Sequence, residues 1–584
     1  MMEDDFYRPS SNGTVPPIAL GTVLWGTVVD FLTSPNVVLA LFLGPFIIAI
    51  LTRYMSGRPV GKGANKLVWR VPYWIPFIGH GFSFLWDPTK LMKEAREQSP
   101  HGVFSLYLGG TTHNIISDPN LVRSVMAQRE SIVQFSPVAW RIIVKFFGIP
   151  EESKFKYDKA WEELNSTLGS LMRDPGLSEL LGRTVKNMEK NVSEMITFVD
   201  TEIDLQPWEK FGNASLISDT ETEIDLVALM RDMMGHASIP AMYGSAFLQK
   251  YPDLLHEIYD MDKGIMYFFL GVPALAPFPA SIKARIARSN IWGALDDQQR
   301  ALDAHAEGKH VDSAWGDMED ISVFARKRNE IYRKYGFKIR ERGELSILWA
   351  LAVNSSLLVY WQILYIFSTP GLVERLREEI APYANVTQPV SIGKISEAPR
   401  LKISADDLSK NCPLLKATYF EALRLTDQPW SVRTLAGDVV ISEENGSEKP
   451  KEGYLLREGE FITLPHDMHM KDPVYFLDPD KFEPERFMTR DDQGKVTVDM
   501  GTIRPYGGGP SLCKGRILAE RECLALIAGI LAFWDIEPAE NKKNWVIPPQ
   551  QKTTAVSRPM HETRVRIRRR VFNWEKQNKS EKTL

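Results

Sequence analysis

A glycine-rich loop that holds a cysteine and runs directly into an amphipathic helix is the feature that most restricts the fold of this chain. The loop, residues 506–516, reads YGGGPSLCKGR, and the run of good helix formers Ile517–Ala532 follows it. Three glycines and a proline predict a tight turn whose backbone lets a flat ligand approach closely. Cys513 then lies just before a helix N-terminus, where amides and dipole favour a thiolate. Such a thiolate is a soft axial ligand for iron, whereas the bland alternative is an inert buried thiol.

The cysteine count and the charge narrow the class of protein. The chain has 584 residues and three cysteines, Cys412, Cys513 and Cys523. An odd number of cysteines this small cannot cross-link a secreted domain by disulfides. We therefore expect a reducing compartment, and we expect Cys412 and Cys523 to be thiols in the core. The net charge of −4, from 70 basic and 74 acidic residues, gives no global basic field for nucleic acid.

An apolar stretch near the N-terminus, residues 32–52, has the length that a membrane-spanning helix requires. The basic residues that follow it at once are Arg53, Arg58, Lys62, Lys66 and Arg70. The positive-inside rule then places the large body of the chain in the cytoplasm. A cleaved signal peptide would carry its basic residues before the apolar core, and a buried core helix would not need a one-sided basic flank.

These assignments divide the chain into four parts. Residues 1–31 are predicted as a lumenal segment with its own apolar stretch, 32–52 as the transmembrane anchor, 53–86 as a basic and proline-rich hinge, and 87–584 as one large domain. The sequon Asn12-Gly13-Thr14 is the one that this topology exposes to the lumen, so we expect a glycoprotein.

The body is predicted to be mainly α with small β-sheets. Val103–Leu108 and His113–Ile116 are typical of a hairpin, and long helical patterns extend from about residue 121 to residue 380. Residues 345–367 are long and apolar enough to cross a membrane, but hold Asn354, Ser355 and Ser356 near their centre. Polar groups of this kind face a protein interior, so we interpret the segment as one long buried helix. Helix chemistry alone leaves open whether the polar trio merely satisfies neighbouring backbone.

Two further motifs precede the cysteine loop. Glu421 and Arg424 stand at positions i and i+3 of one helix, where acid and base can pair. The run FEPERF, residues 482–487, offers Arg486 as a third member of a buried network. A lone Glu-x-x-Arg occurs by chance on many helices, but this order and spacing ahead of the loop is specific.

With these motifs the sequence resembles the cytochrome P450 family over essentially the whole chain after the anchor. Its loop signature, aromatic-x-x-Gly-x-basic-x-Cys-x-Gly, is filled by Tyr506, Gly509, Cys513 and Gly515, with Ser511 where a basic residue often binds a haem propionate. The family's Glu-x-x-Arg motif matches Glu421 and Arg424, and its Pro-Glu-Arg-Phe motif matches residues 484–487. His469 and Asp472 stand where the family often shows His-x-Asp-Pro, and Arg433 stands at a position that commonly contacts a propionate.

The resemblance implies a P450 fold preceded by the transmembrane helix, with 345–367 as the central helix over the distal haem face. The usual acid and threonine of that helix are replaced by Asn354 and Ser355, which would be the catalytic pair. The replacement looks like the branch that contains sterol hydroxylases and prostacyclin synthase. The Trp-x-x-x-Arg motif is not evident, because Asn165 follows Trp161 at that spacing.

By the same resemblance, residues 87–584 are a haem-thiolate catalytic domain with Cys513 as the iron ligand. The expected partners are NADPH-cytochrome P450 reductase, with cytochrome b5 as a second donor, and no nucleic acid. Lys514 and Arg516 suggest a basic face for an acidic reductase. The expected location is the endoplasmic reticulum membrane, single-pass, with the catalytic domain cytoplasmic.

The expected substrate is a lipophilic small molecule, terpenoid-like or steroid-like, oxidised in secondary metabolism. The apolar segments that the resemblance places around the pocket are 132–147, 267–279, 351–355 and 553–556. They contain the aromatic residues Phe135, Phe146, Phe147, Phe268 and Phe269. Each aromatic residue alone is more often core packing than a substrate contact.

Two alternatives to the monooxygenase remain open from the residues. The missing acid on the central helix also suits a haem-thiolate isomerase or dehydratase that works without a reductase. A membrane-anchored binding or scaffold protein that has lost catalysis is the third possibility.

Overall fold

The computed structural model describes residues 34–57, 66–99, 102–389, 398–442, 453–539, 544–553 and 555–572. The chain forms two compact units. The first consists of Met1–Ile115, Val439–Ser442 and Gly446–Phe461, and the second of Ile116–Asp438, Glu443–Asn445 and Ile462–Leu584. The predicted sequon at Asn12 and the lumenal segment 1–31 lie outside the described residues.

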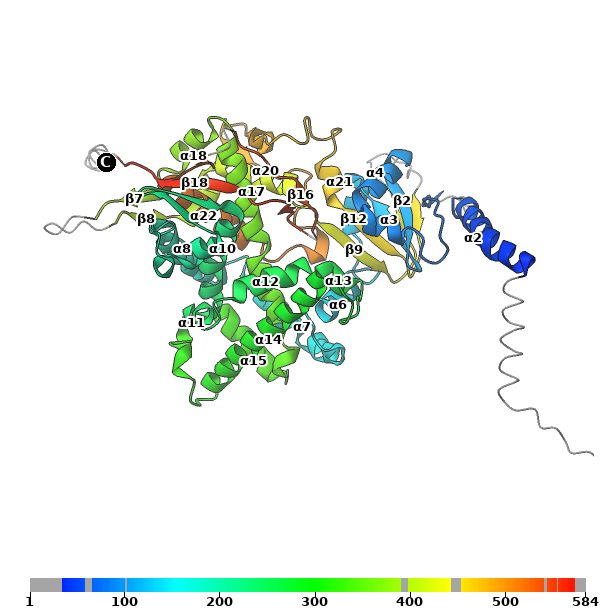
Figure 1. Ribbon diagram of the computed structural model, residues 1–584, viewed down its shortest axis with the longest axis horizontal. Coiled ribbons are helices and arrows are strands. Elements are labelled where there is room, and N and C mark those ends of the chain that lie inside the picture. Colours follow the sequence, from blue (N-terminus) through cyan, green and yellow to red (C-terminus); the bar gives the residue numbers. More distant parts are fainter. Residues whose placement is uncertain are drawn as a thin grey trace, which may run out of the picture. The chain divides into compact units, whose positions relative to one another are not determined.

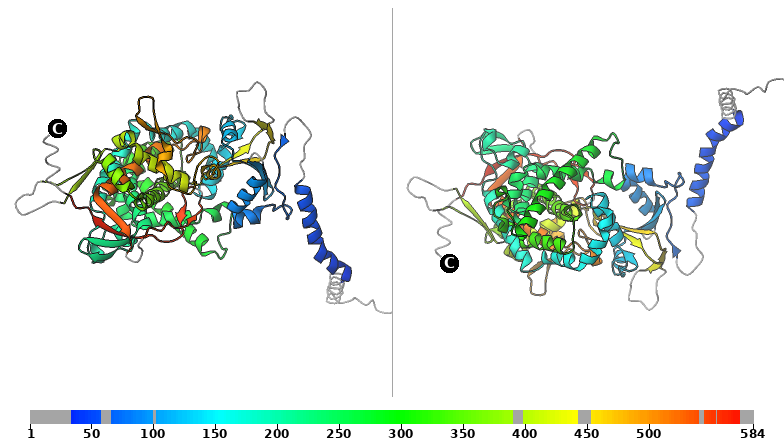
Figure 2. Two further views of the ribbon diagram at one scale, coloured as in Figure 1. Left: turned by 90° about the horizontal axis from the view of Figure 1, so that it is seen from above. Right: turned by 90° about the horizontal axis from the view of Figure 1, so that it is seen from below.

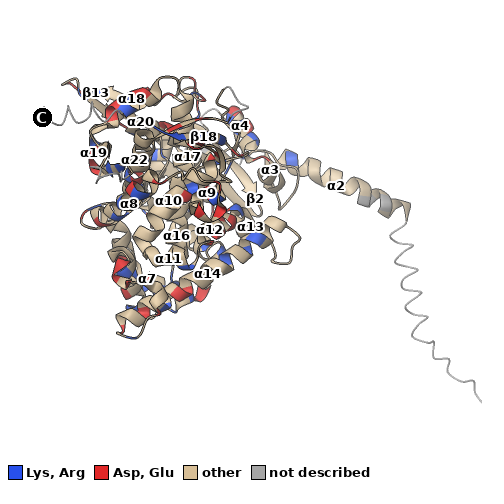
Figure 3. Ribbon diagram, turned by 60° about the vertical axis from the view of Figure 1, so that its left-hand side comes forward, with Lys and Arg blue, Asp and Glu red and all other residues tan. Residues whose placement is uncertain are grey.

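The first unit begins with the apolar helix α2 (Pro35–Ser56), which has 22 residues and includes Pro45. It is long and apolar enough to cross a membrane. In Figure 3 it is tan over most of its length, and its last turn holds the basic Arg53. Arg53 Nη1 donates to the carbonyl of Pro72 at 2.9 Å. The exposed apolar surface and basic end support membrane association of this helix.

A small α/β layer completes the first unit. The helices are α3 (Gly81–Trp86) and α4 (Pro88–Gln98), and the strands are β1 (Lys66–Leu67), β2 (Val103–Leu108), most of β3 (Thr111–Ile116), β10 (Val439–Ile441) and β11 (Tyr454–Leu456). Strands β2 and β3 are neighbours in one sheet. Gly109 and Gly110 both have positive φ, of 55° and 94°, as a two-residue hairpin turn requires. The predicted hairpin is therefore confirmed.

The second unit is mainly helical, which confirms the predicted fold class. Its helices are α5 (Pro119–Met126), α6 (Ser136–Lys145), α7 (Lys154–Ser170), α8 (Gly176–Ser193), α9 (Pro207–Phe211), α10 (Leu226–Tyr243), α11 (Ser245–Lys250), α12 (Leu254–Lys263), α13 (Ile265–Phe269), α14 (Pro279–Ala306), α15 (Val323–Lys334), α16 (Glu344–Ala352), α17 (Asn354–Ser368), α18 (Leu372–Ile380), α19 (Ala405–Asn411), α20 (Pro413–Thr426), α21 (His466–Met470) and α22 (Arg516–Phe533).

Short sheets border these helices. They are β4 (Val133–Gln134) with β9 (Trp430–Leu435) and β12 (Phe461–Pro465); the four-stranded sheet of β15 (Trp534–Pro538), β18 (Arg564–Arg569), β6 (Glu221–Asp225) and β5 (Ser215–Ser218); and the pairs β7 (Ala384–Thr387) with β8 (Arg400–Ile403), β13 (Met488–Arg490) with β14 (Val496–Val498), and β16 (Gln550–Gln551) with β17 (Arg558–Pro559). Figure 2 shows β7 and β8 extending from an edge of the helices.

Helix α17 forms the centre of the core and packs on α10, α20 and α22 (Figure 1). Tyr360 and Trp361 on it are fully buried, and the Trp361 indole N–H donates to the carbonyl of Ser557 at 2.7 Å. Gln362 donates to Thr418 Oγ1 at 2.8 Å. The second apolar segment is therefore a core helix, as predicted.

The predicted single helix over residues 345–367 is interrupted. Helix α16 ends at Ala352, and α17 begins at Asn354 after the connecting Val353. Ser356 Oγ lies 2.7 Å from the carbonyl of Ala352 and 3.0 Å from that of Val353, so its hydroxyl bonds back to the preceding turn. Hydroxyl bonding to backbone of this kind bends helices. One member of the polar trio thus satisfies local backbone.

Candidate active site

The glycine loop is fixed by backbone conformations that other residues adopt at a cost. Gly507 and Gly509 have φ of 71° and 66°. A Cβ at Gly509 would lie 2.8 Å from the carbonyl oxygen of Met126 at the end of α5. The N–H of Cys513 donates to the carbonyl of Tyr506 at 3.2 Å and closes the loop just ahead of α22. The sequence-predicted turn is thus held against a neighbouring helix by glycine.

Cys513 differs from the other two cysteines in being exposed. Cys412 and Cys523 are buried, which confirms their assignment as core thiols. Desolvation by the surrounding protein raises the pKa of Cys513 above its ordinary value, and the N–H of Gly515 and the charge of Arg516 oppose this only in part. The start of α22 therefore does favour the thiolate, as expected, but desolvation outweighs this effect in the free thiol. Coordination to a metal ion would deprotonate it directly.

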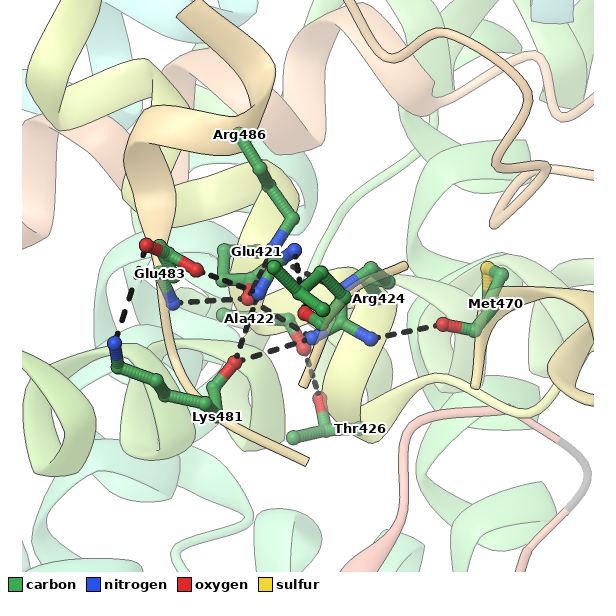
Figure 4. Close-up of polar contacts among 9 residues, drawn as sticks. Glu421, Ala422, Arg424, Thr426, Met470, Lys481, Glu483 and Arg486 are labelled. Carbon is green, nitrogen blue, oxygen red and sulfur yellow. Dashed lines mark hydrogen bonds and ion pairs between the residues drawn. The ribbon is translucent and has the colours of Figure 1, made fainter. Parts of the chain in front are cut away.

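A buried network joins α20 to the segment after it (Figure 4). Arg424 donates to both carboxylate oxygens of Glu421, at 2.7 Å and 2.9 Å. Arg486 Nε and the N–H of Glu483 reach the same Oε1 at 3.0 Å and 2.9 Å. Arg424 also donates to the carbonyl of Met470 at 2.8 Å. Glu421 and Arg424 are both completely buried. The predicted three residues do meet, and every atom of the ion pair that could be left orphaned has a partner.

Arg433 reaches the cysteine loop from β9. Its Nη2 donates to Ser511 Oγ, and its guanidinium lies over the ring of Phe135, 4.7 Å from the centroid. Tyr506 is tied to α20, because its hydroxyl lies 2.5 Å from that of Tyr419. The loop is thus anchored from two directions.

Arg504 is a residue that the sequence reasoning missed. Its Nη1 would lie 3.7 Å from a Cβ built on Gly508, so a second guanidinium stands beside the loop. Its buried Nε has no hydrogen-bond partner in the described part of the chain. The only sequence signal for Arg504 is its position two residues before Tyr506, and no motif requires a basic residue at that spacing.

Asn354 and Ser355 lie at the start of α17. Ser355 is buried, Asn354 is half-buried, and the Cys523 thiol contacts the carbonyl of Ser355 at 3.8 Å. One turn earlier, Ala350 is exposed although α16 is a core element. This face of the central helix is therefore open to a ligand.

The apolar segments converge beside that face. Phe146 and Phe147 after α6 contact the Trp349 ring edge-on, each with a centroid separation of 5.7 Å. Phe268 and Phe269 on α13 contact Phe146 at 5.7 Å and 6.1 Å. Four of the five predicted aromatic residues thus form one cluster with Trp349, in which Phe146 makes the most contacts.

Phe135 is the exception among these aromatic residues. It packs under the guanidinium of Arg433, near the cysteine loop. Phe135 and Phe146 lie at the two opposite ends of helix α6, directly before and directly after it. Sequence order alone does not show that the two ends of this helix serve different parts of the site.

The donor set fits an iron porphyrin. Among the described residues, no group of three or more His, Cys, Asp or Glu could hold a metal ion. An iron atom bound by Cys513 would therefore take its other ligands from a macrocycle. The glycine loop allows close approach, and Arg433 and Arg504 supply guanidinium groups for acidic side arms.

Comparison with known proteins agrees with this fit. The family model described as Cytochrome P450 matches residues 70–565. Cytochrome P450 monooxygenase poxD of Penicillium oxalicum is 23% identical over 519 residues, covering 86% of this chain and 93% of that protein. Cytochrome P450 7B1 of Mus musculus is 23% identical, covering 85% and 88%. The human 7-alpha-hydroxycholest-4-en-3-one 12-alpha-hydroxylase is 21% identical, covering 85% and 91%.

Proposed function

Because the chain belongs to the cytochrome P450 family and is a haem-thiolate monooxygenase, we propose that it hydroxylates a terpenoid-like or steroid-like molecule, with Cys513 as the iron ligand. The exposed thiol in its glycine loop, alone among the three cysteines, carries the proposal. Haem with a thiolate ligand supplies the activation of dioxygen for insertion into a C–H bond. The two electrons for this activation come from a reductase, and the protein's own side chains hold the cofactor, position the substrate and deliver protons.

The residues around the loop hold and orient the cofactor. Arg433 and Arg504 would bind the propionates of a bound haem, in place of the contact that the absent Trp-x-x-x-Arg motif would give. Glu421, Arg424 and Arg486 fix the segment that leads to the loop. Their role is structural, since their polar atoms are already engaged with one another (Figure 4).

Asn354 and Ser355 control proton delivery on the distal side of the haem site. Neither side chain is an acid, so the Asn354 amide orients a water molecule while the Ser355 hydroxyl passes a proton through its hydrogen bonds. Their position beside the exposed Ala350 supports this role.

The substrate class rests on the aromatic cluster around Trp349 and on the relatives. An apolar, aromatic-lined region with few polar groups favours a large lipophilic molecule. One relative is named as a 12-alpha-hydroxylase of 7-alpha-hydroxycholest-4-en-3-one, and another as a P450 monooxygenase of Penicillium oxalicum. We place the reaction in secondary metabolism on the same ground.

Membrane attachment and electron supply complete the proposal. We keep residues 32–52, which overlap α2, as the proposed anchor, and we propose that the protein resides in the endoplasmic reticulum membrane with its catalytic domain facing the cytoplasm. A surface hollow of about 560 Å³ lies beside the cysteine loop, and its lining includes Trp161, Met172, Arg173, Lys514 and Arg516. Three basic residues there suit an acidic reductase.

The test uses membranes that contain this chain together with NADPH-cytochrome P450 reductase. We expect a thiolate-type ferrous–CO absorption band, and product with one added oxygen that carries label from 18O2. Cys513→Ala should abolish the band, whereas the matched variant Cys412→Ala should keep it. A band that survives Cys513→Ala would overturn the ligand assignment.

The isomerase alternative is favoured by one observation, the amide at Asn354 in place of an acid. It predicts turnover without oxygen or reductase. Product formation in anaerobic membranes without NADPH would therefore replace the hydroxylation proposal.

A further inference from the structure

A polar cluster lies among the aromatic residues of the proposed substrate region. The Trp349 indole N–H donates to Asp262 Oδ1 at 2.9 Å. Arg558 Nη2 pairs with the other oxygen, Asp262 Oδ2. Trp349 lies on α16, Asp262 on α12 and Arg558 on β17, so three segments far apart in sequence meet here.

The cluster adjoins the aromatic residues and two of the predicted pocket segments. Trp349 contacts Phe146 and Phe147, and Phe146 in turn contacts Phe268. Trp349 stands on α16 five residues before Asn354, which begins α17 after the break at Val353. Arg558 lies two residues after the predicted pocket segment 553–556. A substrate that extends from Asn354 along α16 therefore reaches this cluster.

Arg558 is only partly engaged. The ion pair is the one side-chain hydrogen bond that its guanidinium makes within the described chain, and a guanidinium has five N–H donors. Its side chain keeps 16% of its exposure and that of Asp262 keeps 7%. Several donors therefore remain available to a ligand that enters the apolar region.

The charges around the pair do not balance. Arg231 of α10 lies over the Tyr259 ring, 3.3 Å from its centroid. Burial lowers the pKa of Arg231, the charge of Arg558 lowers it further, and the charge of Asp262 raises it. Burial raises the pKa of the neighbouring Asp232 to about 7, so this carboxyl is largely uncharged below that pH. Burial also lowers the pKa of His256 to about 4, which keeps it neutral. Two guanidiniums thus share one firmly paired carboxylate in low-dielectric surroundings, and an anion would complete the balance.

We propose that Arg558 and Arg231 form a carboxylate subsite, so the substrate is a lipophilic acid anchored at Arg558 and oxidised at its opposite end. This inference rests on the proposed hydroxylase function and names its substrate class more closely. Asp262 holds Arg558 in place and competes with the substrate carboxylate, and the Trp349 indole fixes Asp262 in turn. Bidentate pairing with a guanidinium distinguishes an acid from its ester.

The test is a spin-state titration of the purified haem-loaded protein, followed by its Soret absorption. The probes are palmitic, abietic and lithocholic acids, each compared with its methyl ester, because the three skeletons differ in shape. We expect at least one acid to bind ten-fold or more tightly than its ester. Arg558→Gln should bring acid and ester within three-fold, and the control Arg566→Gln on β18 should leave the preference unchanged.

A second variant separates binding from a purely structural role. Asp262→Asn keeps an oxygen for the Trp349 N–H but removes the competing charge, so acid affinity should rise at least three-fold while ester affinity stays constant. Equal affinities for acid and ester in all three pairs, absence of acid binding, or an unchanged preference in Arg558→Gln would overturn the subsite. The ferrous–CO band of the same preparations reports separately on the haem-thiolate assignment, so failure of the two proposals is distinguishable.

Discussion

Two arginine–carboxylate pairs in the second unit differ in how completely they are satisfied. Glu421 and Arg424 are fully buried, and their charged atoms are shared with Arg486 and backbone groups (Figure 4). Arg558 makes one contact with Asp262, and its guanidinium keeps free N–H donors. A saturated pair, in which every charged atom already has a hydrogen-bond partner, has no donor or acceptor free for a ligand. We therefore assign it a structural role. An unsaturated pair among aromatic residues has spare donors, and it is where binding is expected.

The largest effect should come from breaking the saturated pair. Glu421→Ala leaves the Arg424 guanidinium buried without its carboxylate, and removing one partner of a buried pair costs about 3–5 kcal/mol. We therefore expect most haem incorporation to be lost, measured as the ferrous–CO band per milligram of protein.

Glu485→Ala is the control for this substitution. Its carboxylate belongs to the same Pro-Glu-Arg-Phe motif, but it pairs with Arg375 while 45% exposed. Exposed pairs contribute about 0–1 kcal/mol. Normal haem content is expected in this variant, and normal haem content in Glu421→Ala as well would contradict the structural role of the network.

Asp427 sharpens the comparison because it is a buried carboxyl with no arginine. It follows α20 directly, and its Oδ1 has no hydrogen-bond partner among the residues that the structure describes. Burial raises its pKa from 3.8 to about 8. The folded state thus keeps a proton that the unfolded chain has released, and stability falls as pH rises through this interval.

Asp427→Asn should remove this pH dependence. The amide carries no charge, so we expect the variant to match the parent near pH 4, where the unfolded carboxyl is still partly protonated, and to be about 1–3 kcal/mol more stable at pH 8. Thermal midpoints of the detergent-solubilised protein at the two pH values measure the difference. A stability gain that is the same at both pH values would show that Asp427 is not the titrating group.

The sequence predicts the saturated network better than the unsaturated one. Glu421 and Arg424 are three residues apart on one helix, so helix geometry alone brings them together. The cysteine loop is equally local, since its glycines and the following helix are contiguous. Such short-range patterns made the fold class and the site loop predictable.

Long-range contacts account for what the sequence did not show. Arg558 and Asp262 are separated by 296 residues, and no periodicity or motif links them. The break at Val353 depends on the hydroxyl of Ser356, whose choice between solvent and backbone is decided by tertiary packing. The raised pKa of Cys513 was not predicted either, because it depends on burial in the folded protein, which outweighs the local effect of Gly515 and Arg516.

The smallest expected effect concerns the indole that supports the unsaturated pair. Trp349→Phe keeps an aromatic ring against Phe146 and Phe147 but removes the N–H that donates to Asp262. One net hydrogen bond contributes about 0.5–1.5 kcal/mol to stability. Trp361→Phe removes a comparable bond, to the carbonyl of Ser557, at a site within the core. Both variants should lower the thermal midpoint by similar amounts, but only Trp349→Phe should change the ratio of acid to ester affinity, by about two- to three-fold, because Asp262 then competes differently for Arg558. Equal affinity ratios in the two variants would show that Trp349 packs beside the pair without positioning it.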